Sequence, residues 1–87
     1  MTIKIQDFVS QYNMQRNKLM LNSGVVHSLA SEYDSFTDTP LGRKLLGAFS
    51  RYTDGEMLMY DGQCAAFMAA FKAMAGTTPH SMIVISE

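Results

Sequence analysis

The chain has 87 residues, a length that predicts a single domain over residues 1–87, and its 47% of hydrophobic residues exclude a disordered tail. Seven Lys/Arg and eight Asp/Glu give a formal net charge of −1, which argues against general binding to DNA through a strongly basic surface. The single cysteine, Cys64, excludes an intramolecular disulfide. Because no apolar run is long enough for a secretory signal or a membrane span, we expect a cytoplasmic protein that does not bind membranes.

Both ends of the chain have the pattern of short strands. Residues 2–5 alternate polar and apolar side chains, and residues 82–85 form a largely β-branched run after Pro79. Because a lone strand leaves its backbone groups unpaired, the two ends should pair with each other or stay extended as arms. The sequence leaves open whether such pairing occurs within one chain or between chains.

Apolar residues at helical spacing predict two helices in the first half of the chain. The first helix covers residues 6–21. Residues 22–24, Asn-Ser-Gly, then either end that helix, with Gly24 just past its last turn, or form a flexible point in a longer helix. A second apolar stripe runs from Val26 to Phe36, and we expect this helix to end before Pro40.

Two further helices are predicted in the second half. Pro40 suits the first turn of a basic amphipathic helix over residues 41–52. Thr53 and Glu56 match the capping-box pattern, which predicts that a new helix starts there or that a long one is interrupted. Residues 54–75 are apolar on nearly every side, with Gly76 in the position of a C-terminal cap.

The apolar character of residues 54–75 also predicts self-association. A monomer of this size has few elements with which to surround such a helix, so its excess apolar face should be an interface between protomers. The fold class expected from these elements is all-α. We predict a small helical hairpin or bundle with short extended N- and C-terminal arms, assembled into a symmetric homo-oligomer.

No catalytic or metal-binding constellation is recognisable, so we expect neither an enzyme nor a cofactor. His27 and His80 are far apart in sequence, and Cys64 lies among alanine and phenylalanine in a helix expected to be buried. Asp54, Glu56 and Asp61 are spaced unlike a calcium-binding loop, and capping of a helix start accounts for two of these three acids.

Anion binding by side chains is the chemistry that the residues allow. Two basic clusters, Arg16 with Lys18 and Arg43 with Lys44 and Arg51, could each hold an anion. No glycine-rich phosphate loop is present. Nucleobases could stack on the four tyrosines, although the first expectation for each ring is a place in the core or an interface: Tyr12, Tyr33, Tyr52 and Tyr60.

Residues 66–75, Ala-Phe-Met-Ala-Ala-Phe-Lys-Ala-Met-Ala, resemble the C-terminal helix of a phage family of small helical anti-CBASS sponges, which ends in a pattern close to Gly-Phe-Met-Ala-Leu-Val-Arg-Ala-Val-Ala. Asn17-Lys18 followed by Gly24 and Leu29 is a looser similarity to the family's preceding helix. The resemblance implies a compact helical protomer that assembles into a hexamer. It also implies sequestration of cyclic di- and trinucleotide second messengers, without bond cleavage, at protomer interfaces.

The family holds its dinucleotides with an aromatic near the N-terminus and a lysine in the following helix. Tyr12 is the matching aromatic, Lys18 is the nearest lysine, and Lys72 takes the position of the family's closing arginine. With the two basic clusters, the expected ligand-binding residues are Tyr12, Arg16, Lys18, Arg43, Arg51 and Lys72.

A different class of function fits the same composition. Eight methionines and several phenylalanines could form an adaptable apolar surface. The alternative prediction is a small helical protein that binds and inhibits a bacterial protein through this Met/Phe-rich face.

Overall fold

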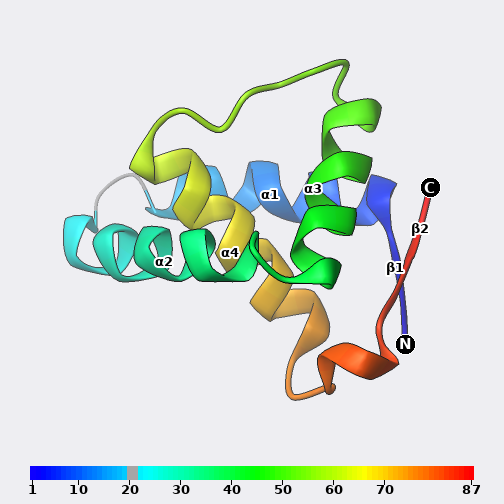
Figure 1. Cartoon of the computed structure of the whole chain (residues 1–87). Helices are drawn as coiled ribbons and strands as arrows, with labels where there is room; N and C mark the ends of the chain where they lie inside the picture. Colours follow the sequence, from blue (N-terminus) through cyan, green and yellow to red (C-terminus); the bar gives the residue numbers. More distant parts are fainter. Residues whose placement is uncertain (20–21) are drawn as a thin grey trace.

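The computed structural model describes residues 1–19 and 22–87, and in this part of the chain helices dominate (Figure 1). The elements in chain order are β1 (Thr2–Lys4), α1 (Ile5–Leu19), α2 (Ser23–Phe36), α3 (Pro40–Tyr52), α4 (Asp61–Ala75), the 3-10 helix η1 (His80–Met82) and β2 (Val84–Ser86). The expectation of a mostly helical fold is therefore confirmed.

The two ends of the chain pair with each other. β1 and β2 lie side by side in a two-stranded parallel sheet, with Ile3 opposite Ile85 (Figure 1). The strands are slightly displaced from the predicted ranges, because Ile5 already begins α1 and Met82 belongs to η1. Since Ile3 is fully buried, the sheet closes one end of the core.

The break between the first two helices differs from both predicted alternatives. Asn22 is the N-cap of α2, and its side-chain oxygen accepts a hydrogen bond from the backbone N–H of Val25 at 3.2 Å. Gly24 therefore lies in the first turn of α2 and neither ends α1 nor forms a flexible point. Residues 20 and 21 of the predicted first helix lie outside the described residues.

The junction between α2 and α3 follows the prediction. α2 ends at Phe36, and Pro40 occupies the first turn of α3. The Thr39 hydroxyl donates to the Phe36 carbonyl at 2.6 Å and accepts from the Gly42 N–H at 3.0 Å. Gly42 is required here because a Cβ at this position would collide with the Phe36 backbone.

The predicted helix start at residue 54 is wrong. Asp54 and Gly55 adopt φ values of 57° and 87°, which end the α3 helix. The Thr53 hydroxyl accepts from the Glu56 N–H at 3.3 Å, as the capping-box pattern suggested, but it also donates to the Phe49 carbonyl at 2.7 Å and so belongs to the end of α3. Residues 53–60 form a non-helical connector that crosses one side of the molecule before α4 begins (Figure 1).

α4 is the central helix of the core. The ring of Phe67 contacts aromatic rings on all three other helices, with centroid distances of 5.0 Å to Phe8, 5.5 Å to Tyr33 and 5.5 Å to Phe49. These pairs are edge-to-face, the geometry that aromatic quadrupoles favour. Seven residues of α4 are buried: Ala65, Ala66, Phe67, Met68, Ala70, Phe71 and Ala75.

This burial removes the argument that linked α4 to an oligomer interface. α1 and α2 pack directly against α4, and α3 reaches it through Phe49. The alanines allow this close approach within one chain. An oligomer therefore has to be argued from other surfaces.

Replacing Phe67 by alanine should destabilise the fold strongly, because the cavity would border all three neighbouring helices. We expect a loss of about 3–5 kcal/mol in the free energy of unfolding, measured by urea denaturation. Met57→Ala is the control, because the Met57 side chain is 68% exposed and its removal should change stability by less than about 0.5 kcal/mol. Equal effects of the two changes would contradict the central position of Phe67.

Candidate functional site

One surface groove combines a cation with an exposed aromatic ring. It has a volume of about 570 Å³ and lies between the end of α1 and the starts of α2 and α4. We call it the Arg16–Tyr60 groove, and its main lining side chains are Arg16, Val26, His27, Tyr60, Asp61 and Gln63.

Gln63 fixes the backbone of Tyr60 at the start of α4. Its side-chain oxygen accepts hydrogen bonds from the backbone N–H groups of Met59 at 2.9 Å and Tyr60 at 3.0 Å. These bonds satisfy donors just before the helix, as the third residue of a capping box does. The Tyr60 side chain is left 73% exposed at the groove.

Arg16 supplies the positive charge of the groove. It is exposed near the end of α1, and its guanidinium carbon lies 5.9 Å from the centroid of the Tyr12 ring. Within the described residues, no carboxylate is close enough to Arg16 to form an ion pair. Its guanidinium is therefore available to an anion from solution.

Tyr12, the expected stacking residue, is fully buried beneath Arg16. Its ring packs edge-to-face on Phe49 at 5.0 Å, so it has no free face for a nucleobase. Burial, reinforced by the nearby Glu56 carboxylate, raises the pKa of Tyr12 to about 12. The Tyr12 hydroxyl has no hydrogen-bond partner in the described structure. A ligand role for Tyr12 would require its ring to leave the core.

The other expected ligand residues on α1 and α3 do not join this groove. Lys18 is exposed two residues after Arg16, a spacing that directs it to the opposite side of the helix. Arg43 donates to the backbone carbonyl of Asp38 at 2.6 Å, where it closes the α2–α3 turn. Neither side chain lines the Arg16–Tyr60 groove.

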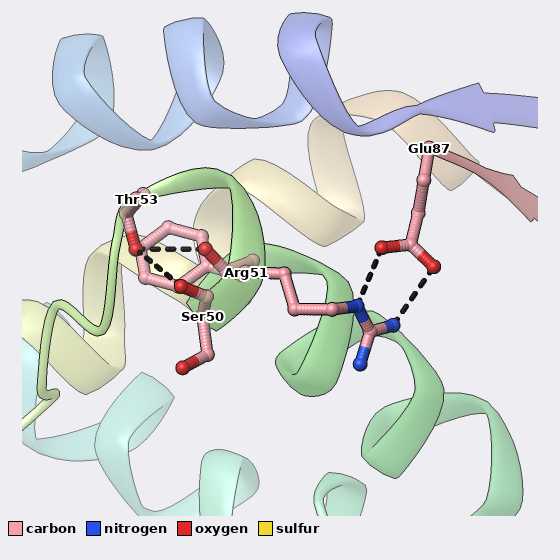
Figure 2. A network of polar contacts seen from close by, with 5 residues as sticks. Ser50, Arg51, Thr53 and Glu87 are labelled. Atoms are coloured by element: carbon pink, nitrogen blue, oxygen red, sulfur yellow. Dashed lines mark hydrogen bonds and ion pairs between the residues drawn. The ribbon is translucent and has the colours of Figure 1, made fainter.

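Arg51 is held by the C-terminal residue. Its Nε and one Nη donate to the two carboxylate oxygens of Glu87 at 2.6 and 2.8 Å (Figure 2). This bidentate pair ties the end of α3 to the segment after β2. Arg51 therefore serves the fold in this structure, and an anionic ligand would have to displace Glu87.

Lys72 lies on a second groove, between the C-terminal halves of α2 and α4. This groove has a volume of about 550 Å³ and an apolar floor that includes Phe36 and Phe71. The Lys72 ammonium donates to both carboxylate oxygens of Glu32, at 2.7 and 2.8 Å, across the two helices. The structure thus separates the six expected residues, with only Arg16 and Tyr12 close together.

Sequence reasoning missed two features of the Arg16–Tyr60 groove. The sequence presents Tyr60 as one of four candidate stacking tyrosines, and it presents Asp61 only as one of three acids whose spacing is unlike a calcium-binding loop. The available signal was Gln63, three residues after Tyr60, which marks a helix start there. A tyrosine is an unusual residue at the N-cap, so the sequence pattern favours a helix start at Thr53–Glu56 over one at Tyr60.

Cys64 is a partly buried thiol near the start of α4. Burial raises the pKa of the Cys64 thiol, and the Asp34 and Asp61 carboxylates raise it further, which disfavours the nucleophilic thiolate. In the described part of the chain, no three His, Cys, Asp or Glu side chains are arranged to hold a metal ion. Nor does any described helix have both the length and the apolar character needed to cross a membrane.

Comparisons of the chain with protein-family models, with curated proteins and with solved structures found no match. The geometry of the grooves is therefore the basis for a functional proposal.

Replacing Tyr12 by phenylalanine should remove one phenol ionisation at high pH. Because the pKa is raised, the neutral phenol stabilises the fold fully below the ordinary value of about 10, and this stabilisation is lost as the pH rises to about 12. An ultraviolet titration should therefore show one phenolate signal near pH 12 in the wild type that Tyr12→Phe lacks. A difference between the two proteins near pH 10 would contradict the buried position.

Breaking the Arg51–Glu87 pair should return the Glu87 carboxyl to ordinary titration. Hydrogen bonding and the charge of Arg51 hold the pKa of the Glu87 side chain below its usual value. The pair's stabilisation is thus present above that usual value and is lost as the pH falls through the lowered one. NMR titration of Arg51→Gln should show the Glu87 midpoint moving upward, and an unchanged midpoint would mean that the pair does not form in solution.

Proposed function

We propose that the protein is a non-catalytic sponge that sequesters cyclic di- and trinucleotide second messengers. The observation that carries the proposal is the Arg16–Tyr60 groove, where a guanidinium without an ion pair among the described residues and a largely exposed aromatic ring line the same depression. Arginine binds phosphate through charge-assisted hydrogen bonds, and tyrosine offers a stacking surface to any base. The groove volume of about 570 Å³ lies within the range typical of small-ligand sites.

The proposal keeps the ligand class implied by the resemblance but changes the residues. Tyr60 replaces Tyr12 as the stacking ring, because Tyr60 is 73% exposed and Tyr12 is buried. Arg16 replaces Lys18 as the principal phosphate ligand, because it lines the groove with Tyr60. The raised pKa of the Cys64 thiol supports binding without chemistry.

Assembly and location form part of the same proposal. A symmetric homo-oligomer, a hexamer by the resemblance, would bring several grooves together in one particle. By the resemblance, the compartment is the bacterial cytosol, where a phage-encoded sponge would meet such messengers.

A second candidate function, inhibition of a bacterial protein, is favoured by the exposure of two methionines on the connector. Phe8, Phe49 and Phe67 are fully buried, whereas Phe36 and Phe71 line the floor of the second groove. The connector instead exposes Met57 and Met59, each 68% accessible. Flexible methionines at an exposed site suit an adaptable protein contact.

Replacing Arg16 by glutamine should weaken nucleotide binding, because it removes the charged phosphate contact. Native mass spectrometry with a panel of cyclic di- and trinucleotides identifies the ligand and the oligomer, and calorimetry then measures Kd. We expect Kd to rise by roughly ten- to a hundredfold, equivalent to a loss of about 1.5–3 kcal/mol. Ligand released on denaturation should have an unaltered mass.

Lys18→Gln is the matched control, since it removes the same charge from the same helix on the opposite side. Its Kd should stay within about twofold of the wild-type value. Binding that depends on Lys18 and not on Arg16 would contradict the groove assignment. Failure to retain any nucleotide would contradict the sponge and favour a protein partner at Met57 and Met59.

A further inference from the structure

We infer that Asp61 makes the Arg16–Tyr60 groove selective for guanine-containing ligands; this inference rests on the proposed function. Asp61 follows Tyr60 directly and lines the same groove. In the described residues, no cationic side chain lies within ion-pair distance of its carboxylate. The Asp61 oxygens are therefore available to hydrogen-bond donors on a ligand.

The charges of the groove orient a nucleotide. Arg16 and Asp61 carry opposite charges and come from different elements, the end of α1 and the first turn of α4. A phosphate is attracted to Arg16 and repelled by Asp61. The phosphate end therefore lies at the α1 side, and the base lies at the α4 side, beside the exposed Tyr60 ring.

The base that stacks on Tyr60 brings its edge near the neighbouring Asp61. A carboxylate only accepts hydrogen bonds and can accept two in parallel. Guanine alone presents two adjacent N–H donors, N1–H and N2–H, on its Watson–Crick edge. Adenine presents an amino group next to the N1 lone pair, which an anionic carboxylate repels. Asp61 therefore favours guanine and disfavours adenine. Such recognition of the Watson–Crick edge is possible because the bases of the ligand are unpaired.

Gln63 fixes the backbone that positions the Asp61 carboxylate. Because its side chain accepts from the N–H groups of both Met59 and Tyr60, the backbone leading into Asp61 is held at the helix start. Discrimination by paired hydrogen bonds needs this rigidity, since a misdirected carboxylate would make one bond at most.

The test compares the cyclic dinucleotide that carries two guanines with the one that carries two adenines. For the wild type, calorimetry should give a Kd about tenfold or more lower for the guanine ligand. Asp61→Asn should raise the guanine Kd by about tenfold and leave the adenine Kd unchanged or lower, because the neutral amide no longer repels the adenine N1 lone pair. Circular dichroism checks that α4 still forms.

Asp54→Asn is the matched control, because it makes the same chemical change on the connector outside the groove. Asn tolerates the φ of 57° at that position, so its Kd values should equal those of the wild type. Equal wild-type affinity for both ligands, or an equal loss of both in Asp61→Asn, overturns guanine selection while the sponge function stands. If the wild type binds neither ligand nor any other cyclic nucleotide, the sponge proposal and this inference fail together.

Discussion

The contacts of the Phe67 ring hold the helices of this small protein together. A single side chain on α4 meets Phe8 on α1, Tyr33 on α2 and Phe49 on α3, each in edge-to-face geometry. With so few residues available for a core, one shared aromatic centre buries apolar surface on several helices at once. The grooves at the surface depend on this packing, since both are bounded by α2 and α4.

Ion pairs and capping bonds decide which basic residues remain available. Arg51 is bound to Glu87, Lys72 to Glu32, and Arg43 to the carbonyl of Asp38. These contacts join segments that are distant in sequence or close a turn, so they serve the arrangement of the helices. Arg16 lacks such a partner among the described residues and faces a groove instead. Among the arginines of the described residues, Arg16 is thus the one that no such contact holds.

The connector links the core to the candidate site. Asp54 and Gly55, with positive φ, end α3 and send the chain across the molecule before Gln63 fixes the new helix start. This path exposes Tyr60 and the two methionines while Leu58 packs against the core. The same segment therefore provides the aromatic wall of the groove and the apolar side chains that a protein partner would meet.

The sequence by itself determined the mostly helical class, the end of α2, the start of α3 at Pro40 and the strand character of both ends. These features depend on local periodicity, on the fixed φ of proline and on β-branched side chains. Arg16 was also recognisable as a candidate anion ligand, because charge is visible without a fold.

Only the tertiary structure decided the burial of α4, the burial of Tyr12 in the core and the position of Tyr60 and Asp61 at one groove. Periodicity shows that a helix is apolar but not whether its own chain or a second protomer covers it. The start of α4 depends on the Gln63 side-chain amide, which accepts hydrogen bonds from two backbone N–H groups. The residue at the N-cap is Tyr60 and not one of the residues common there, so the sequence pattern does not indicate this helix start. Which cation stays free likewise depends on partners such as Glu87 and Glu32, brought close to Arg51 and Lys72 only when the chain folds.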